Sequence, residues 1–192
     1  GLTLLTSVPA DNSIADAKIS GLSASKLTGA LPAIDGSNLT GLSGSNVKEV
    51  LAMLCDGENY TVGSGTYTPT DVTASAATSN SFGELTGSKI TYTPPAGTTA
   101  VQYEFFFQIS AHNAQHGILA ARLVIDGTEV TESRSHIGAN SILGTLICFK
   151  RVIPIGGSAS AATGRQATWT SGKELKIECR RHSSSNEMRL HT

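Results

Sequence analysis

Apolar and polar residues alternate along much of the chain that follows residue 58. Five apolar residues occupy every second position from Val101 to Ile109, and Gln or Glu takes three of the four positions between them. A period of two places one face of a strand against a core and the other toward water. Phe106 stands on the polar face of this strand, which indicates either an edge covered by another element or a contact between subunits.

A turn signal joins two further apolar runs. Asp126-Gly127 lies between residues 123–125 and 128–130, and Asp-Gly between β-branched runs favours a hairpin with a type I′ turn. Many short strands without a long helix predict a mainly β fold, an antiparallel jelly-roll-like β-sandwich over residues 58–192. Gly, Pro and Ser clusters separate its other predicted strands, at 61–68, 71–76, 88–93, 117–125, 128–136, 143–154, 165–170, 173–180 and 186–191.

One short helix is predicted at residues 46–57. Asn46 and Glu49 have the spacing of a capping box, apolar residues recur at helical spacing as far as Leu54, and Gly57 ends the pattern. Such a short helix is marginal alone in water, so it requires partners. It either packs on its own domain or forms a neck where three copies of the chain meet, and the flanking repeat favours the neck.

Residues 1–45 form a repetitive zone rich in Ser, Thr and Gly. Lys18–Leu27 realigns on Asn38–Val47 with a 20-residue offset, and four of the ten positions are identical. Apolar residues are sparse, so a single chain cannot bury enough surface to offset the entropy of ordering, whereas several parallel copies around an axis can. The core of a trimer is therefore assigned to Leu22, Leu27, Leu31, Leu39, Leu42, Val47, Val50, Leu51 and Leu54.

Composition narrows the classes of function. A formal net charge of −1 argues against a general binder of polyanions, so we expect no nucleic-acid partner. No apolar run is long enough to cross a bilayer and no signal peptide is visible, so we expect no membrane insertion. Because the chain begins with Gly1, we expect it to be a piece of a longer polypeptide.

The cysteines predict neither a disulfide framework nor a zinc knuckle. The chain has three, an odd number, and none has CxxC spacing. Cys148 and Cys179 lie in alternating strand patterns, where a buried, inert thiol is expected. No cofactor is expected.

The repeats and the apolar neck resemble the distal parts of tail fibres and receptor-binding proteins of tailed bacteriophages. The resemblance is carried by Lys26–Pro32 and Asp35–Leu42, and by Lys89–Thr98 ahead of the Phe-rich strand. It implies a parallel homotrimer with a repetitive fibre shaft at 1–45, a short helical neck at 46–57 and a C-terminal head at 58–192. It also implies an extracellular place on the virion and viral attachment to the host cell surface.

Catalytic and metal-binding patterns are sparse. Asp126, Glu129 and Glu132 cluster near the predicted hairpin, but the turn explains Asp126, and a glycosidase needs an acid of raised pKa in a sizeable cleft. We therefore expect no enzymatic activity. The spacing of His112 and His116 suits metal ligands on a helix, but both lie in a predicted loop, so they are weak candidates and no metal is expected.

Receptor binding is assigned to Trp169, Arg165, Arg180 and Arg181. A lone Trp in a polar segment can stack on a sugar, and the arginines can meet anionic surface polymers. The expected partner is a host cell-surface glycan or an outer-membrane protein, bound by three weak sites acting together. Two other functions fit the same pattern: a structural virion appendage without receptor contact, and a trimeric binding module of the complement or cytokine type.

Overall fold

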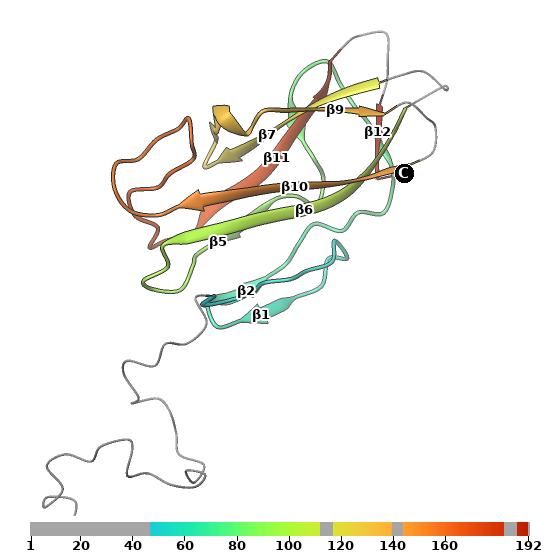
Figure 1. The fold of residues 1–192 in the computed structure, drawn as a ribbon. Helices are drawn as coiled ribbons and strands as arrows, with labels where there is room; N and C mark the ends of the chain where they lie inside the picture. Colours follow the sequence, from blue (N-terminus) through green and yellow to red (C-terminus); the bar gives the residue numbers. More distant parts are fainter. Residues whose placement is uncertain (1–46, 112–116, 140–143, 183–187, 192) are drawn as a thin grey trace, which may run out of the picture. The chain divides into compact units, whose positions relative to one another are not determined.

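The computed structural model describes residues 47–111, 117–139, 144–182 and 188–191 (Figure 1). The predicted shaft at 1–45, with the trimer-core positions Leu22, Leu27, Leu31, Leu39 and Leu42, lies outside the described residues, as do His112 and His116. The described elements, all strands except the 3-10 turn η5, are β1 (Tyr60–Val62), β2 (Gly65–Tyr67), β3 (Ala76–Ala77), β4 (Gly83–Glu84), β5 (Ile90–Tyr92), β6 (Ala100–Ala111), β7 (Gly117–Ile125), β8 (Thr128–Glu129), η5 (Thr131–Ser133), β9 (Ser135–Ala139), β10 (Thr145–Pro154), β11 (Lys173–Arg181) and β12 (Met188–Leu190).

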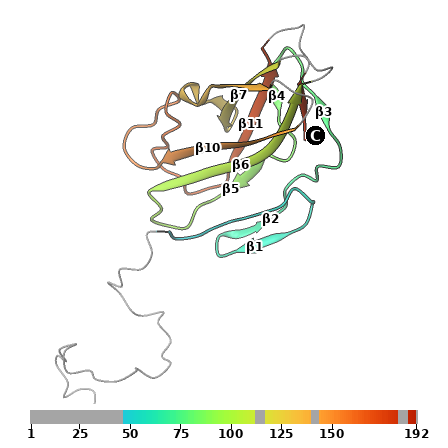
Figure 2. The same ribbon diagram turned by 45° about the vertical axis from the view of Figure 1, so that its right-hand side comes forward.

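Two antiparallel sheets face each other across one core, which confirms the predicted mainly β sandwich (Figures 1 and 2). One sheet has the strand order β10-β6-β12-β3. In the other, β11 pairs with β4, β5 and β7, and β7 also pairs with β8 and β9. The chain crosses between the sheets after β3, β5, β6, β9, β10 and β11, which is the kind of connection found in jelly rolls.

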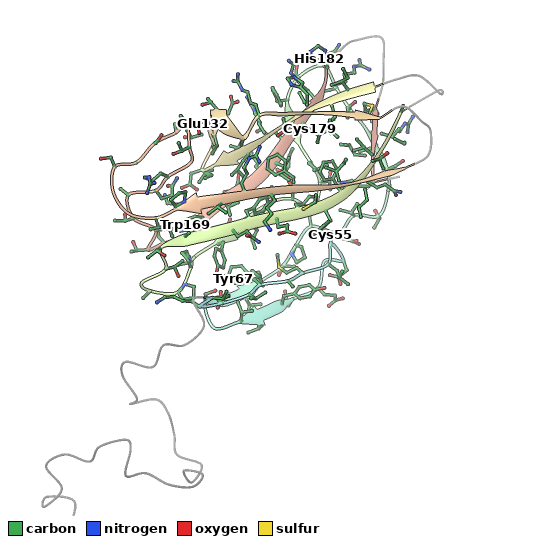
Figure 3. All side chains as sticks on the ribbon, viewed as in Figure 1. Cys55, Tyr67, Glu132, Trp169, Cys179 and His182 are labelled. Carbon is green, nitrogen blue, oxygen red and sulfur yellow. The ribbon has the colours of Figure 1, made fainter. Side chains whose placement is uncertain are left out.

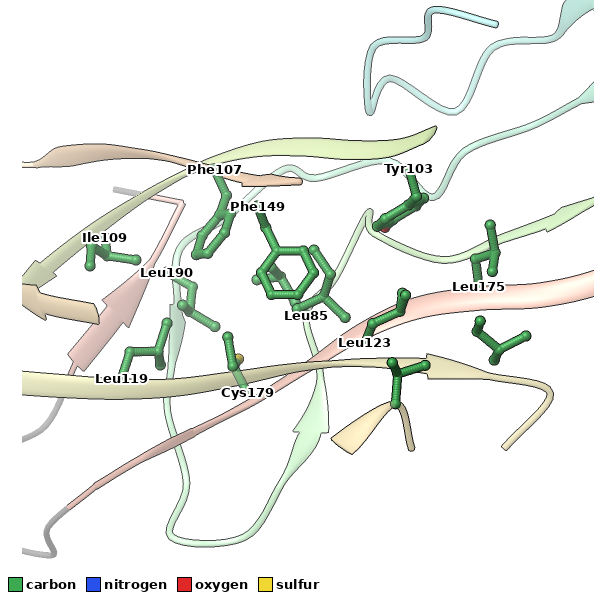
Figure 4. Packing of buried hydrophobic residues seen from close by; sticks show 14 of the residues in the cluster. Leu85, Tyr103, Phe107, Ile109, Leu119, Leu123, Phe149, Leu175, Cys179 and Leu190 are labelled. Carbon is green, nitrogen blue, oxygen red and sulfur yellow. The ribbon is translucent and has the colours of Figure 1, made fainter. Parts of the chain in front are cut away.

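The core consists of the inward side chains of both sheets. Phe107 from β6 and Phe149 from β10 pack against Leu119 and Leu123 from β7 and Cys179 from β11 (Figure 4). These side chains occupy every second position of their strands, so the alternation predicted from the sequence is the alternation that builds the core.

The predicted hairpin is confirmed. Ile125 pairs with Thr128, and the two residues between them, Asp126 and Gly127, have φ of 47° and 75°. Positive φ at both central positions is the geometry of a type I′ turn, and its twist matches that of the flanking strands.

Several predicted strand boundaries are wrong. The strand predicted at 61–68 is a hairpin of β1 and β2, and the one at 128–136 is divided into β8, η5 and β9. The strand at 71–76 reduces to the first residue of β3, and residues 165–170 form only isolated bridges.

The predicted neck helix is also wrong, because residues 47–59 contain no helix. Burial instead alternates, with Glu49 and Leu51 partly covered and Val50 exposed. Glu49 decides this conformation: one carboxylate oxygen accepts from the Ser64 hydroxyl at 2.5 Å and the Tyr92 hydroxyl at 2.9 Å, and the other from the Ser64 amide at 2.8 Å. Contacts with the sandwich therefore outweigh the local preference for helix. Val47, Val50 and Leu54, predicted trimer-core residues, are 59–72% exposed in the single chain.

The three cysteines differ in burial, and none forms a disulfide. Cys179 is buried, as predicted, and burial raises the pKa of its thiol to about 12. The prediction for Cys148 is wrong, since it is exposed on the outer face of β10. Among the described residues, no helix is long and apolar enough to cross a membrane.

Candidate ligand-binding site

The connection between β10 and β11, residues 155–172, forms one end of the sandwich (Figure 1) and is called the 155–172 loop. It folds on itself: Ser160 pairs with Arg165, and the Gly164 amide donates to the Ser160 carbonyl at 2.9 Å. Gly164 has φ of 79°, and a Cβ added there would lie 3.1 Å from a methyl carbon of Val130. Glycine at this position therefore lets the loop pack tightly against Val130, which follows β8.

Hydrogen bonds hold the 155–172 loop against the rest of the sandwich. The Glu132 amide donates to the Ala162 carbonyl at 3.0 Å, and the Trp169 indole N–H donates to the Tyr92 carbonyl at 2.9 Å. A loop fixed at two points loses less entropy when a ligand orders it, so its walls are pre-organised for binding.

A hollow of about 240 Å³ lies between the 155–172 loop and the Asp126-Gly127 turn, and is called the Asp126 hollow. A few polar groups over an apolar floor are typical of sites for small ligands. The polar lining residues are Asp126, Thr128, Ser160, Arg165, Gln166 and Lys173, and the others are Ile125, Val130, Ala159, Ala161 and Gly164.

Asp126 and Lys173 supply opposite charges to the rim of the Asp126 hollow. Lys173 Nζ lies 3.2 Å from Asp126 Oδ2, and Asp126 Oδ1 accepts a hydrogen bond from the Glu174 amide at 2.8 Å. The Asp126 side chain is 47% exposed and that of Lys173 is 23% exposed. Both groups are therefore open to a ligand, the carboxylate as an acceptor and the ammonium as a donor.

The opposite wall carries amide and guanidinium donors. The Arg165 guanidinium donates to the Gly156 carbonyl at 3.2 Å, and the Gln166 amide nitrogen donates to the Gly164 carbonyl at 2.9 Å. These hydrogen bonds fix the orientation of the Arg165 and Gln166 side chains. A guanidinium has five N–H groups and a primary amide has two, so both side chains have donors beyond these bonds.

A second hollow, of about 390 Å³, lies between Pro94–Thr98 and Ala167–Thr170, with Ile155 beside them. Trp169 is among its lining residues but is only 5% exposed, and its ring meets Tyr92 edge-on at 6.3 Å. The prediction of Trp169 as an exposed stacking surface is therefore wrong: its indole belongs to the core and supports the loop from below.

The structure separates the predicted receptor-binding residues. Arg165 and Trp169 lie before the first residue of β11, whereas Arg180 and Arg181 lie at its last residues. Figure 3 shows the same separation between Trp169 and His182. The Arg180 guanidinium lies 5.2 Å from the centre of the Phe82 ring, and Arg181 Nε donates to Asn80 at 2.7 Å. These two arginines hold the 79–82 segment and do not share a surface with Arg165.

Two histidines without any ligand spacing in the sequence come together at this far end. The rings of His136 and His182 lie 5.3 Å apart. His136 pairs with Ala120 of β7, and the His182 amide on the other side of β7 donates to the Ile118 carbonyl at 2.8 Å. Within the described ranges, no group of three His, Cys, Asp or Glu side chains is arranged to hold a metal ion.

The clustered carboxylates of the sequence have separate structural partners. Glu129 accepts from Arg122 and Arg134, and the hydrogen bond from Arg134 is the main reason that the pKa of Glu129 lies below its usual value. Asp126 pairs with Lys173. The sequence did not predict that Asp126, Gln166 and Lys173 line one hollow. The turn alone accounted for Asp126, and no sequence pattern indicated that the 155–172 loop lies beside it.

Comparison with known proteins shows low similarity. No family model and no curated protein matches the chain. A solved structure described as "EclA C-terminal domain; sugar-binding protein" has a TM-score of 0.35 and 16% identity, covering 79% of this chain and 84% of that one. The structure of infectious bursal disease virus Gt strain has a TM-score of 0.25 and 14% identity, covering 70% of this chain and 36% of that one.

Proposed function

We propose that the chain is a virion fibre adhesin, a homotrimer whose C-terminal head recognises a glycan on the host cell surface. The Asp126 hollow carries this proposal, because it places a carboxylate, an ammonium, a guanidinium, an amide and hydroxyl groups around an apolar floor. Sugars offer vicinal hydroxyls that donate and accept at once, beside C–H faces that favour apolar contact. A volume of about 240 Å³ fits one terminal sugar unit better than an extended peptide.

The mechanism is reversible binding without covalent chemistry. Asp126 accepts from ligand hydroxyls, Lys173 and Arg165 donate to ligand oxygens, and the exposed methyl groups of Ala159 and Ala161 contact the apolar face of the ring. Each hollow is small, so each site binds weakly. Three copies on one trimer raise the effective concentration and convert weak sites into firm attachment.

The direct test is a glycan array and a whole-cell binding assay on the full chain. Asp126→Asn is the sharpest variant, because Asn-Gly also adopts a type I′ turn while the carboxylate is lost. We expect Asp126→Asn to weaken glycan binding by at least about tenfold, since one charge-assisted hydrogen bond contributes about 1.5–3 kcal/mol.

A matched pair of lysine variants provides the control. Lys173→Gln removes a rim charge that lies 3.2 Å from Asp126, and Lys89→Gln removes one that lies 3.2 Å from Glu84, away from the hollow. Only Lys173→Gln is expected to reduce binding. Equal loss in both variants, or no binding to any glycan or host cell by the wild-type chain, contradicts the proposal. Binding to cells but not to glycans points to a protein receptor instead.

Two functions from other classes make different predictions. A structural appendage without receptor contact predicts no binding to host cells under any condition. A glycosidase predicts turnover of the bound glycan, which mass spectrometry of the glycan after prolonged incubation detects; we propose that none occurs.

A further inference from the structure

The outer face of β6 and β10 carries large apolar side chains that are mostly exposed to solvent. Phe106 is 58% exposed, Leu146 is 70% exposed and Val152 is 56% exposed. Outward positions of a sheet that covers a core are ordinarily polar. The surface is called the β6–β10 face and consists of Gln102, Glu104, Phe106, Gln108, Leu146, Cys148, Lys150 and Val152.

The register gathers these side chains into neighbours. Phe106 lies directly opposite Cys148, and Leu146 lies two residues before Cys148 on the same face. The exposed thiol thus adjoins Phe106 and Leu146, while Val152 lies further along the same strand. Contiguous apolar surface of this kind on a single chain marks an interaction surface.

The fold of the single chain does not need this apolar surface. The inward residues of the same strands, Phe107, Phe149 and Ile153, already fill the core at 4% exposure or less. Strand β10 is moreover the edge of its sheet, and no described strand pairs with its other side. Because a long edge strand invites pairing with another chain, proteins cover such edges or blunt them with charged residues, Pro or bulges.

The charges of the β6–β10 face fit a second copy of the same face. Its central row holds one ion pair, in which Lys150 Nζ lies 3.3 Å from Glu104 Oε2. Lys150 belongs to β10 and Glu104 to β6. When three such faces surround a threefold axis, the β10 side of one copy adjoins the β6 side of the next. Each junction then places Lys150 beside Glu104 of another copy, and the charges alternate around the axis.

We propose that the β6–β10 face is the contact between copies of this chain, with Phe106 and Leu146 packed at the threefold axis and Lys150 paired to Glu104 of the neighbouring copy. This inference rests on the homotrimer in the proposed function and adds that the head itself holds the trimer together.

The first test is the mass of the full chain in solution, by light scattering over a range of concentrations. Phe106→Glu combined with Leu146→Glu is expected to raise the concentration needed for a trimer at least tenfold, with an unchanged far-ultraviolet circular dichroism spectrum. Ile118→Glu is the matched control, because Ile118 is a 45% exposed apolar residue on the outer face of the other sheet.

Charge reversal tests the pairing between copies. Glu104→Lys and Lys150→Glu each place like charges at every junction, so each is expected to dissociate the trimer, and the double variant is expected to restore it. Both side chains are partly exposed within one chain, so reversal changes the fold of the monomer little. A role confined to the single chain does not predict dissociation and rescue of the trimer.

Cys148 reports on burial of the face. Maleimide is expected to label Cys148 at least tenfold more slowly in the wild-type trimer than in the Phe106→Glu, Leu146→Glu variant. If this variant remains a trimer and Cys148 is labelled equally fast in both proteins, the β6–β10 face is not the contact between copies. The contact would then lie in the residues that precede β1. A wild-type chain that is monomeric at every concentration overturns both the interface and the homotrimer, while glycan binding by the Asp126 hollow is still measured separately.

Discussion

Glu49 connects the segment before β1 to the sandwich, so its removal tests why residues 47–56 are extended. Its carboxylate accepts three hydrogen bonds, from the amide and hydroxyl of Ser64 and from the hydroxyl of Tyr92. Hydrogen bonds to a charged group each contribute about 1.5–3 kcal/mol when sheltered, and water replaces part of that at a half-buried site. We therefore expect Glu49→Ala to lower the free energy needed to open this segment by about 2 kcal/mol.

The assay follows the Ser64 amide, whose hydrogen bond to Glu49 is 2.8 Å long. A local loss of about 2 kcal/mol makes its hydrogen exchange about 30-fold faster in Glu49→Ala. If the segment opens only together with the head, the melting temperature falls by about 4–8 °C. Glu58→Ala is the control, since Glu58 is exposed, and a surface change of this kind stays within about 0.5 kcal/mol. Unchanged exchange and melting in Glu49→Ala would refute the reasoning.

The pH dependence of the same contact has a definite sign. Partial burial of Glu49 raises its pKa, but the hydrogen bonds from Ser64 and Tyr92 outweigh that effect and hold it below the ordinary value of 4.5. A carboxyl group whose pKa is lower in the folded state stabilises the fold above the ordinary value and loses that contribution as the pH falls through the folded value. The difference in stability between wild type and Glu49→Gln should accordingly shrink as the pH falls below 4.5.

The other predictions concern the core, the turn, the thiols and the trimer. Trp169→Ala should lower the free energy of unfolding by about 3–5 kcal/mol in urea titrations, and Trp169→Phe by less than half as much, because the indole is only 5% exposed. Gly127→Ala should lower the free energy of unfolding by about 1–2 kcal/mol, because a side chain is strained at a φ of 75°. An unaltered melting curve would contradict the turn assignment. Cys179 should resist maleimide at pH 7 until urea unfolds the chain, since burial raises its pKa to about 12. Leu54→Asp should leave the concentration needed for a trimer unchanged, because Leu54 lies outside the β6–β10 face, and circular dichroism should show a folded head, because Leu54 is 70% exposed.

The sequence by itself determined the strands that form the core. Alternation from Val101 to Ile109 gave β6 its inward and outward faces, and Asp126-Gly127 gave the hairpin its turn. Both signals are local, because a strand face and a type I′ turn depend on residues within a few positions of each other. Phe106 also stood out in the sequence, as an apolar residue on a polar face, and it is exposed.

Only the tertiary structure decided the conformation of residues 47–56 and the membership of the candidate site. The helical pattern ending at Leu54 gave way to an extended segment because Glu49 meets Ser64 and Tyr92, which are 15 and 43 residues away. Trp169 became a core residue through its bond to Tyr92, 77 positions distant. Partners so far apart are brought together by strand pairing between sheets, and no short-range pattern of apolar and polar residues encodes which strands will be neighbours.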